Sequence, residues 1–382
     1  MPGHLSAFLD QNGLDGFLYV GESYGDADMY YLSRFLAGDR FALLAGEKTT
    51  LLVSSMELGR ARKESVADRV LSTSEFHFLE KLKMGKRPDE AYALVLAEFL
   101  GRCSVKRLGV PHNFPAGIFW YLEQDLSVQI LDSPAARQRE IKSPEELEAI
   151  ALTQRACERA MRRAVRLIAG SDVRGEILYR RDEPLTSDGI RRAIDISLLE
   201  DGCEAVDTIV AGGRQAADPH ARGEGPLPAN APIVIDIFPR SKSSRYFADM
   251  TRTVLKGEAS SEVVEMYRAV EMAKKAGLQA VREGATGSEV HRRVSDVFLE
   301  QGYPEREGCG FTHSTGHGVG LEVHERPSLG EAGEATLKSG QVVTVEPGLY
   351  YTDLGGVRLE DLVVVEKDGC HNLTRLQRKL VV

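Results

Sequence analysis

Short apolar runs alternate with polar stretches in the first third of this 382-residue chain. GFLYV (16–20), FALLAG (41–46) and TTLLVS (49–54) have the length and composition of buried strands. The polar stretch MELGRARKESVADR (56–69), which comes after these runs, has helical character. The alternation predicts an N-terminal domain of the α/β class.

The pattern is interrupted at DSPAARQREIKSP, residues 132–144. Two Ser-Pro steps and a cluster of charges are typical of a turn at a domain boundary. We therefore predict an N-terminal domain over residues 1–134 and a second domain over residues 135–382.

Three segments of the second domain carry helix start and stop signals. In the first, Ser143 is a candidate N-cap, Pro144 takes the first helical position, Glu146 completes a capping box and Gly170 ends the helix. The other two repeat this pattern, with Thr186 and Gly202 around one helix, and Thr286, Glu289 and Gly302 in the other.

Between these helices lie strand-like runs rich in β-branched residues: 231–238, 245–255, 340–350 and 357–365. Helices around a largely antiparallel sheet predict an α+β second domain. Each run contains an acid among apolar residues, namely Asp236, Asp249, Glu346 and Glu360.

Buried acids need positive partners, because removing water from a carboxylate without compensation costs several kcal/mol. Any one acid could cap a turn or pair with an arginine. Apart from Arg245 at the edge of one run, the same strands contain only Arg252 and Arg358 as cations, too few for the whole set. The excess of acid predicts a pair of divalent metal ions.

The segment FTHSTGHGVGLEVHE (311–325) contains three of the nine histidines. His313 and His317 are four residues apart, but the glycines around them oppose a helix, so we expect a strand-like or irregular segment with close backbone approach. This differs from the helical H-E-x-x-H motif of zinc proteases. One imidazole with four carboxylates is an oxygen-rich ligand set that suits Mn²⁺, Co²⁺ or Fe²⁺, with Zn²⁺ as an alternative.

The motifs DTIVAGGRQAADPH, VIDIFPR, FADMTRTV, HSTGHGVGLEVHE, VVTVEPGLY and GVRLEDLVVV succeed one another between residues 205 and 365. Their order resembles that of the pita-bread metallopeptidases, in the branch of prolidase (Xaa-Pro dipeptidase) and aminopeptidase P. YYLSRF (30–35) and REIKSPEELEAI at the domain junction are weaker likenesses. The resemblance implies an α/β N-terminal domain followed by an α+β pita-bread catalytic domain, with a curved, largely antiparallel sheet flanked by helices.

The resemblance also implies roles for individual residues. Two divalent ions, Mn²⁺ first and Co²⁺, Zn²⁺ or Fe²⁺ as alternatives, would be bound by five ligands, with Asp249 and Glu360 bridging the ions. Glu346 would also move the proton, His313 or His220 would donate to the developing oxyanion, and His324 and Arg358 would hold the substrate. The five implied ligands are Asp236, Asp249, His317, Glu346 and Glu360.

One departure from the family pattern lies between the first two acids. The family usually has Asp-x-Gly here, whereas Asp236 is followed by Ile-Phe-Pro-Arg and stands thirteen residues before Asp249. A hairpin longer by about two residues keeps both acids on one face, because side chains alternate along a strand. Arg240, Lys242 and Arg245 could form a cationic rim that meets the carboxylate of a dipeptide, although we expect SKSS (241–244) to be a solvated loop.

The implied reaction is hydrolysis of an Xaa-Pro peptide bond, with Xaa-Pro dipeptidase favoured. The alternatives are an aminopeptidase P acting on longer peptides, a creatinase-like hydrolase of another small amide, and a binding module without catalysis. The resemblance further implies a homodimer.

Composition and charge limit the partners and the cellular location that we expect. A formal net charge of −9, without a basic stripe interleaved with aromatic residues, argues against a nucleic-acid partner. Five widely spaced cysteines without a C-x-x-C pair argue against a disulfide framework and favour a reducing cytoplasm. The N-terminal residues lack a signal-peptide pattern and no run approaches 18 apolar residues, so we expect neither export nor a membrane span.

Overall fold

The computed structural model describes residues 2–304 and 308–382 and divides the chain into two compact units, Met1–Arg139 and Glu140–Val382. The boundary that we predicted at 134/135 falls at the start of the last helix of the first unit, Pro134–Arg139. None of the described helices has the length and apolar character that a membrane span requires.

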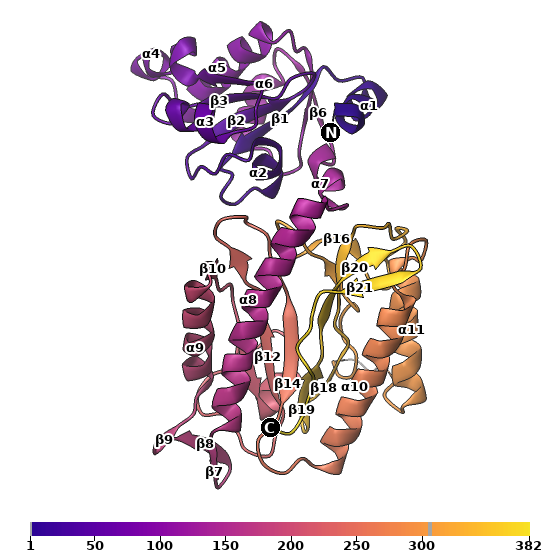
Figure 1. Ribbon diagram of the computed structural model, residues 1–382. Coiled ribbons are helices and arrows are strands. Elements are labelled where there is room, and N and C mark those ends of the chain that lie inside the picture. Colours follow the sequence, from indigo (N-terminus) through magenta and orange to yellow (C-terminus); the bar gives the residue numbers. More distant parts are fainter. Residues whose placement is uncertain (1, 305–307) are drawn as a thin grey trace. The chain divides into compact units, whose positions relative to one another are not determined.

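The first unit contains one mixed six-stranded sheet in the order β4-β3-β2-β1-β5-β6 (Figure 1). The strands are β1 (Gly16–Gly21), β2 (Phe41–Ala45), β3 (Thr50–Val53), β4 (Arg69–Ser72), β5 (Arg107–Val110) and β6 (Ser127–Ile130). The helices are α1 (Pro2–Asn12), α2 (Ala27–Ser33), α3 (Leu58–Glu64), α4 (Phe78–Lys83), α5 (Pro88–Arg102), α6 (Ala116–Leu122) and α7 (Pro134–Arg139). The predicted α/β class of this unit is confirmed.

The helix predicted over 56–69 is shorter in the structure. α3 ends at Glu64, and Arg69 already belongs to β4, which pairs in parallel with β3. The pairing satisfies backbone groups that a longer helix would have used internally. The apolar strand residues pack against α5, which we did not predict, in a core that includes Leu18, Leu52 and Phe99.

Over residues 140–304 and 308–382, the second unit contains four long helices and several antiparallel sheets. The helices are α8 (Pro144–Ala169), α9 (Ser187–Glu200), α10 (Ser261–Ala280) and α11 (Gly287–Glu300). Small two- and three-stranded sheets contain β7 (Asp172–Arg174), β8 (Ile177–Arg180), β9 (Glu183–Pro184), β10 (Cys203–Glu204) and β13 (Arg240–Ser241), whereas β16 (Glu325–Ser328) is the edge strand of the five-stranded sheet. The remaining strands are β11 (Ile209–Gly212), β12 (Ile233–Ile237), β14 (Met250–Val254), β15 (His317–Gly318), β17 (Val342–Val345), β18 (Gly348–Tyr351), β19 (Gly355–Arg358), β20 (Asp361–Glu366) and β21 (Gly369–Asn372).

The predicted helix caps are present. Ser143 accepts the N–H of Glu146 and forms a capping box with it at the start of α8. Thr186 caps α9 by accepting the N–H of Gly189, and Thr286 caps α11 within a second box. These side chains bind the N–H groups that the first helical turn leaves unpaired.

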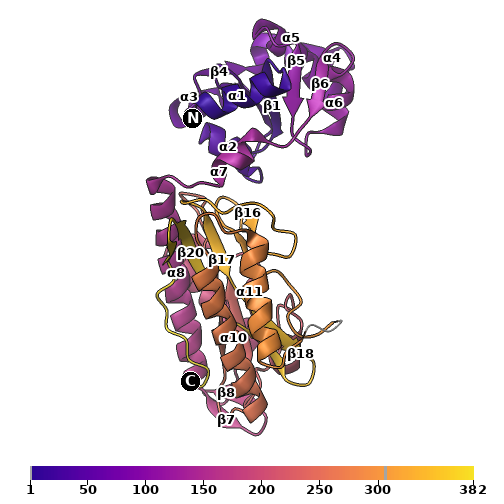
Figure 2. The same cartoon turned by 90° about the vertical axis from the view of Figure 1, so that its right-hand side faces the viewer.

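α8 and α9 lie on one side of the central strands, and α10 and α11 lie side by side on the other (Figures 1 and 2). Ile233, Ile235 and Ile237 of β12 share an apolar core with α8 and α9. Side chains alternate between the two faces of a strand, so Asp236 of β12 points away from that core. This α+β architecture of antiparallel sheets flanked by helices confirms the second predicted class.

Two of the four predicted strand runs are interrupted at their acid. Run 340–350 divides into β17 and β18 at Glu346, and run 357–365 divides into β19 and β20 at Glu360. β17 pairs with β20 through Val345 and Asp361, and β18 pairs with β19 through Gly348 and Arg358. Both pairs keep the same register, which places Glu346 and Glu360 opposite one another in the gap.

Candidate active site

A cavity of about 220 Å³ lies in the second unit. Its lining includes every residue that the sequence singled out for chemistry: His220, Asp236, Asp249, His313, His317, His324, Glu346, Arg358 and Glu360. Apolar side chains, among them Ile209, Phe238 and Val323, complete the lining. Residues distant from one another in the sequence therefore meet in one pocket.

Irregular backbone brings the candidate ligands together. Asp236 is inside β12, whereas Asp249 directly precedes β14, so the long run predicted over 245–255 is a strand only in its second half. Gly316 allows the segment before His317 to press against a neighbouring strand, because a Cβ there would lie 2.0 Å from the carbonyl oxygen of Thr344. The expected close backbone approach around His317 is confirmed.

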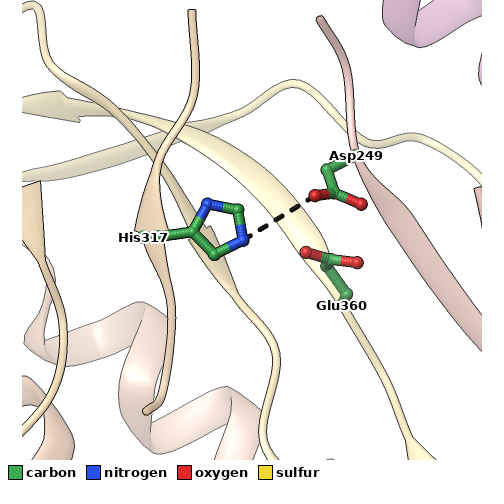
Figure 3. Close-up of side chains that lie close together, drawn as sticks. All are labelled: Asp249, His317 and Glu360. Atoms are coloured by element: carbon green, nitrogen blue, oxygen red, sulfur yellow. Dashed lines mark ion pairs between the residues drawn. The ribbon is translucent and has the colours of Figure 1, made fainter. Parts of the chain in front are cut away.

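Asp249, His317 and Glu360 form a compact group whose candidate ligand atoms all lie within 4.8 Å of one another. Figure 3 shows the three side chains directed toward one another. His317 Nε2 lies 3.8 Å from Asp249 Oδ2 and 3.2 Å from Glu346 Oε1. The group comes from three separate segments, as a metal site built by tertiary structure requires.

The hydrogen bonds of His317 prepare its ring for a cation. Its Nδ1 lies 3.1 Å from the carbonyl oxygen of Gly318, which can only accept, so Nδ1 carries the proton. When the ring is protonated, Nε2 donates to Glu346, and when the ring is neutral, Nε2 is an acceptor facing the carboxylates of Asp249 and Glu346. Such an arrangement holds together when a proton or a metal ion lies between the acceptors.

The carboxylates repel one another. Burial, and then the charges of Glu360, Asp236 and Glu346, raise the pKa of Asp249 well above its usual value. Burial, followed by the charges of Glu346 and Asp236, likewise raises the pKa of Glu360. Burial also favours protonation of Glu346, but the hydrogen bond and charge of His317 outweigh it and lower the pKa of Glu346 to about 2. Divalent cations would relieve this repulsion.

Unpaired oxygens give a direct test of whether the residues fit metal ions. Among residues 2–304 and 308–382, the buried atoms Asp236 Oδ1 and Glu360 Oε1 have no hydrogen-bond partner. Arg252, an arginine close to the acids but outside the cavity lining, binds Asp361 and the backbone oxygen of Glu360 instead of these carboxylates. Buried anionic oxygens without donors are the ligands that a divalent cation would use, so the site fits.

A hydrogen-bonded network lies beside the ligands. Arg358, which is buried, donates to Asp236 Oδ2 at 2.7 Å and to the Tyr350 hydroxyl at 2.8 Å. His313 Nδ1 lies 2.7 Å from the carbonyl oxygen of Ser314, so its Nε2 accepts from the Tyr350 hydroxyl at 2.9 Å. Burial lowers the pKa of His313, which favours this neutral ring. His313 is therefore occupied in holding Tyr350.

Tyr350 and Thr251 are parts of the site that the sequence did not reveal. Thr251 donates to Glu360 Oε2 at 2.9 Å and accepts from Arg358 Nε at 3.2 Å, so it aligns an acid with an arginine. Tyrosine and threonine are ordinary strand residues. The available signal was their spacing from an acid: Thr251 is two residues after Asp249 and Tyr350 is four residues after Glu346, intervals that share one face in a continuous strand.

His220 and His324 are exposed at the cavity. The ring of His324 stands edge-on to that of His317, with centroids 4.3 Å apart. Burial, and then the charge of His317, lower the pKa of His324, so the ring is neutral near pH 7. Both side chains have the access to solvent that contact with a substrate requires.

The cations of the longer hairpin do not reach the cavity. Arg240 Nε and Arg245 Nη1 both bind Glu204 Oε1, at 2.5 and 3.2 Å, and neither residue lines the pocket. Lys242 and Ser243 are exposed, as expected of a solvated loop. The hairpin therefore provides no cationic rim to select a dipeptide in this structure.

Profiles of two known protein families match this chain. A profile of metallopeptidase family M24 matches residues 147–367, and one of the creatinase/prolidase N-terminal domain matches residues 3–141. The chain belongs to metallopeptidase family M24. The first match covers the catalytic cavity and all of its candidate ligands, and the second covers the α/β unit.

Individual relatives match along the whole chain. An Xaa-Pro dipeptidase of Pyrococcus horikoshii is 30% identical over 383 residues, covering 98% of this chain and 96% of the relative. The crystal structure of the prolidase from Pyrococcus horikoshii OT3 aligns with a TM-score of 0.81 at 27% identity, covering 99% and 98% of the two chains. An X-Pro aminopeptidase from Thermotoga maritima MSB8 aligns with a TM-score of 0.80 at 28% identity, covering 97% and 98%.

Proposed function

We propose that this chain is a dinuclear-metal hydrolase that cleaves Xaa-Pro dipeptides. The observation that carries the metal part is the group of buried carboxylates around His317, with two anionic oxygens lacking donors among the described residues. Membership of family M24 supports divalent ions as the cofactor. The residues that would hold the ions in this proposal are Asp236, Asp249, His317, Glu346 and Glu360.

Mn²⁺ is the proposed metal, with Co²⁺, Zn²⁺ and Fe²⁺ as alternatives. Four carboxylates and one imidazole form a hard ligand set without thiolate, which favours Mn²⁺ over metals that prefer sulfur. Metal content of protein purified without added metal, measured by mass spectrometry, tests this choice.

The chain's own residues divide the proposed reaction between them. Two divalent ions, when bound, would lower the pKa of a water and polarise the scissile carbonyl. Glu346 is ionised, receives a hydrogen bond from Thr344 Oγ1 at 3.2 Å, and takes the proton of the attacking water before passing it to the leaving nitrogen.

The histidines and Arg358 hold and stabilise the reacting groups in this proposal. His220 donates to the developing oxyanion, because His313 is engaged by Ser314 and Tyr350. His313 supports this step by holding Tyr350 in place. His324 contacts the substrate's carbonyl or carboxylate end, and Arg358 keeps Asp236 oriented at the edge of the same pocket.

The substrate part rests on the relatives. The Xaa-Pro dipeptidase of Pyrococcus horikoshii covers nearly the whole chain, which favours a dipeptide ending in proline. The similarity to the X-Pro aminopeptidase of Thermotoga maritima supports the alternative of longer peptides. The apolar side chains Ile209, Phe238 and Val323 of the cavity suit a proline ring.

A paired assay tests the substrate. An Xaa-Pro dipeptide and the same sequence extended by two residues are incubated with Mn²⁺-loaded protein, each with and without EDTA. We expect cleavage of the dipeptide, much slower cleavage of the extended peptide and of an Xaa-Ala control, and loss of turnover with EDTA. Comparable rates on the two lengths would favour the aminopeptidase, and cleavage of neither would favour a hydrolase of another small amide.

We further propose that the protein is a homodimer in a reducing cytoplasm. The dimer rests on the resemblance of the N-terminal unit, including YYLSRF, to that of related enzymes. The location rests on five cysteines, none of them in a disulfide. Light scattering at working concentration is expected to give twice the mass of one chain, and a monomer would contradict the dimer.

A further inference from the structure

A second cavity of the catalytic unit is lined mainly by arginines. It measures about 430 Å³ and shares no described lining residue with the active-site cavity. Five arginines surround it, and we refer to them as the arginine pocket: Arg159, Arg162, Arg163 and Arg166 of α8, and Arg180 of β8. The four on α8 have the spacing i, i+3, i+4, i+7, so they form one stripe on the helix surface.

The acids around the arginine pocket do not balance it. Three of its arginines have acidic partners: Arg159 with Asp201 at 2.8 Å, Arg163 with Glu200 at 3.3 Å, and Arg162 with Glu158 at 3.1 Å. Glu158 also binds Arg155 at 2.8 Å, so its charge is divided. Across residues 2–304 and 308–382, no ion pair is formed by Arg166 or Arg180, and both are exposed. The arginine pocket therefore has a surplus of positive charge, although the net charge of the whole chain is −9.

Guanidinium groups match phosphate oxygens with paired, charge-assisted hydrogen bonds. The stripe on α8 extends about 10 Å at 1.5 Å per residue, which is longer than a single phosphate or carboxylate can span. The cavity volume lies within the roughly 300–1,000 Å³ of typical ligand pockets. We propose that the arginine pocket binds a small polyphosphate anion, either a free polyphosphate or the triphosphate of a nucleotide.

Binding is measured on the metal-loaded protein by calorimetry with tripolyphosphate, ATP and adenosine. Metal content is determined after each titration, so that extraction of active-site ions is separated from binding. We expect saturable binding of tripolyphosphate and ATP that weakens as NaCl is raised, because salt screens the exposed charges. Tighter binding of ATP would identify a nucleotide as the source, and equal binding would identify the phosphate chain; both support the proposal. Adenosine binding as tightly as ATP would overturn it.

The double variant Arg166→Ser/Arg180→Ser removes the two arginines without ion pairs. We expect its affinity for tripolyphosphate to fall by about tenfold or more, since two charge-assisted contacts are lost. Arg166→Lys/Arg180→Lys keeps the charge but loses the planar guanidinium groups. Its affinity for tripolyphosphate is expected to lie between those of the serine variant and the unaltered protein. Arg292→Ser/Arg293→Ser, which removes two exposed arginines of α11, is the matched control and should bind like the unaltered protein. Equal loss in the control, or no saturable binding by the unaltered protein, would show that the pocket is not a polyphosphate site.

Discussion

At the scale of single residues, the site is recognisable because its charged side chains lie among buried apolar residues. Asp236 lies between isoleucines of β12, and Glu346 and Glu360 adjoin buried valine and leucine residues. A carboxylate in such a place must find a cation. Arg358 pairs with Asp236, and the remaining acids of the metal group meet His317 and one another. An acid among buried apolar residues is therefore recognisable both in the sequence and in the structure.

The histidines separate metal binding from turnover. His317→Ala should lose metal and activity together, because its Nε2 lies among the carboxylates. His313→Ala should keep the metal and lower kcat by about a hundredfold, since Tyr350 loses its acceptor beside the reacting groups. Bound metal is counted by mass spectrometry in the same samples used for kinetics. Tyr350→Phe, which removes only the hydroxyl, is the control and should resemble His313→Ala. If His313→Ala releases an ion, the two histidines have been assigned in reverse.

At the scale of secondary-structure elements, capped helices were predictable from local sequence. α8, α9 and α11 begin at the caps expected of them, because capping depends on residues three positions apart. α10 was overlooked although Ser260 caps it and Val263, Met266, Tyr267 and Val270 form a buried stripe. The cap and the apolar spacing of α10 are therefore local signals from which this helix is predictable.

The interruptions of the strands were harder to predict. Pro347 is a local signal against a continuous strand, but nothing in RLEDLVVV marks the break at Glu360. That break results from pairing with β17 and β18, which are separate strands in the sequence. Tertiary pairing thus decides where the two glutamates face each other. For the same reason, sequence could identify the acids without locating Thr251 and Tyr350 beside them.

A buried ion pair connects the start of α8 with β16. Lys142 Nζ lies 3.0 Å from Glu325 Oε2, with 2% and 4% of the two side chains exposed. Lys142→Met should destabilise the protein by about 3–5 kcal/mol, because Glu325 stays buried after this ion pair is lost. Urea unfolding monitored by circular dichroism measures the change.

Arg174→Met is the matched control for this pair. It breaks the ion pairs of Arg174 with Asp182 at 2.9 Å and with Asp172 at 3.7 Å in the same unit, and 46% of the arginine side chain is exposed. We expect a change below about 1 kcal/mol, as for surface ion pairs in general. Adding Glu325→Gln to Lys142→Met should recover part of the loss. A cost for Lys142→Met as small as that of the control would contradict a stabilising role for the buried pair.

At the scale of the whole molecule, the buried acids of the site lower the stability of the folded protein unless metal ions are bound. The folded pKa values of Asp249 and Glu360 are raised above their ordinary values, so the folded metal-free protein holds protons that the unfolded chain releases. That contribution to stability is present below a pH of about 4 and is lost as the pH rises through the folded values. His317 acts in the same direction at higher pH, since hydrogen bonding and the charge of Glu346 outweigh its burial and raise its pKa. Glu346, with a pKa of about 2, is the opposing case, but its contribution is lost only as the pH falls from about 4 toward 2.

Metal-free protein should therefore become less stable as the pH rises above about 4, by up to about 1.4 kcal/mol per pH unit for each proton released. Mn²⁺ favours the ionised carboxylates and neutral His317, so its stabilising effect should grow over the same interval. Scanning calorimetry at several pH values, with EDTA or with Mn²⁺, gives both unfolding curves. Asp249→Asn removes one of the titrating groups without removing its volume, and its metal-free stability should depend less steeply on pH. Metal-free stability that rises from about pH 5 to pH 8 in the unaltered protein would mean that the pKa values of the site's carboxyl groups are not raised by folding.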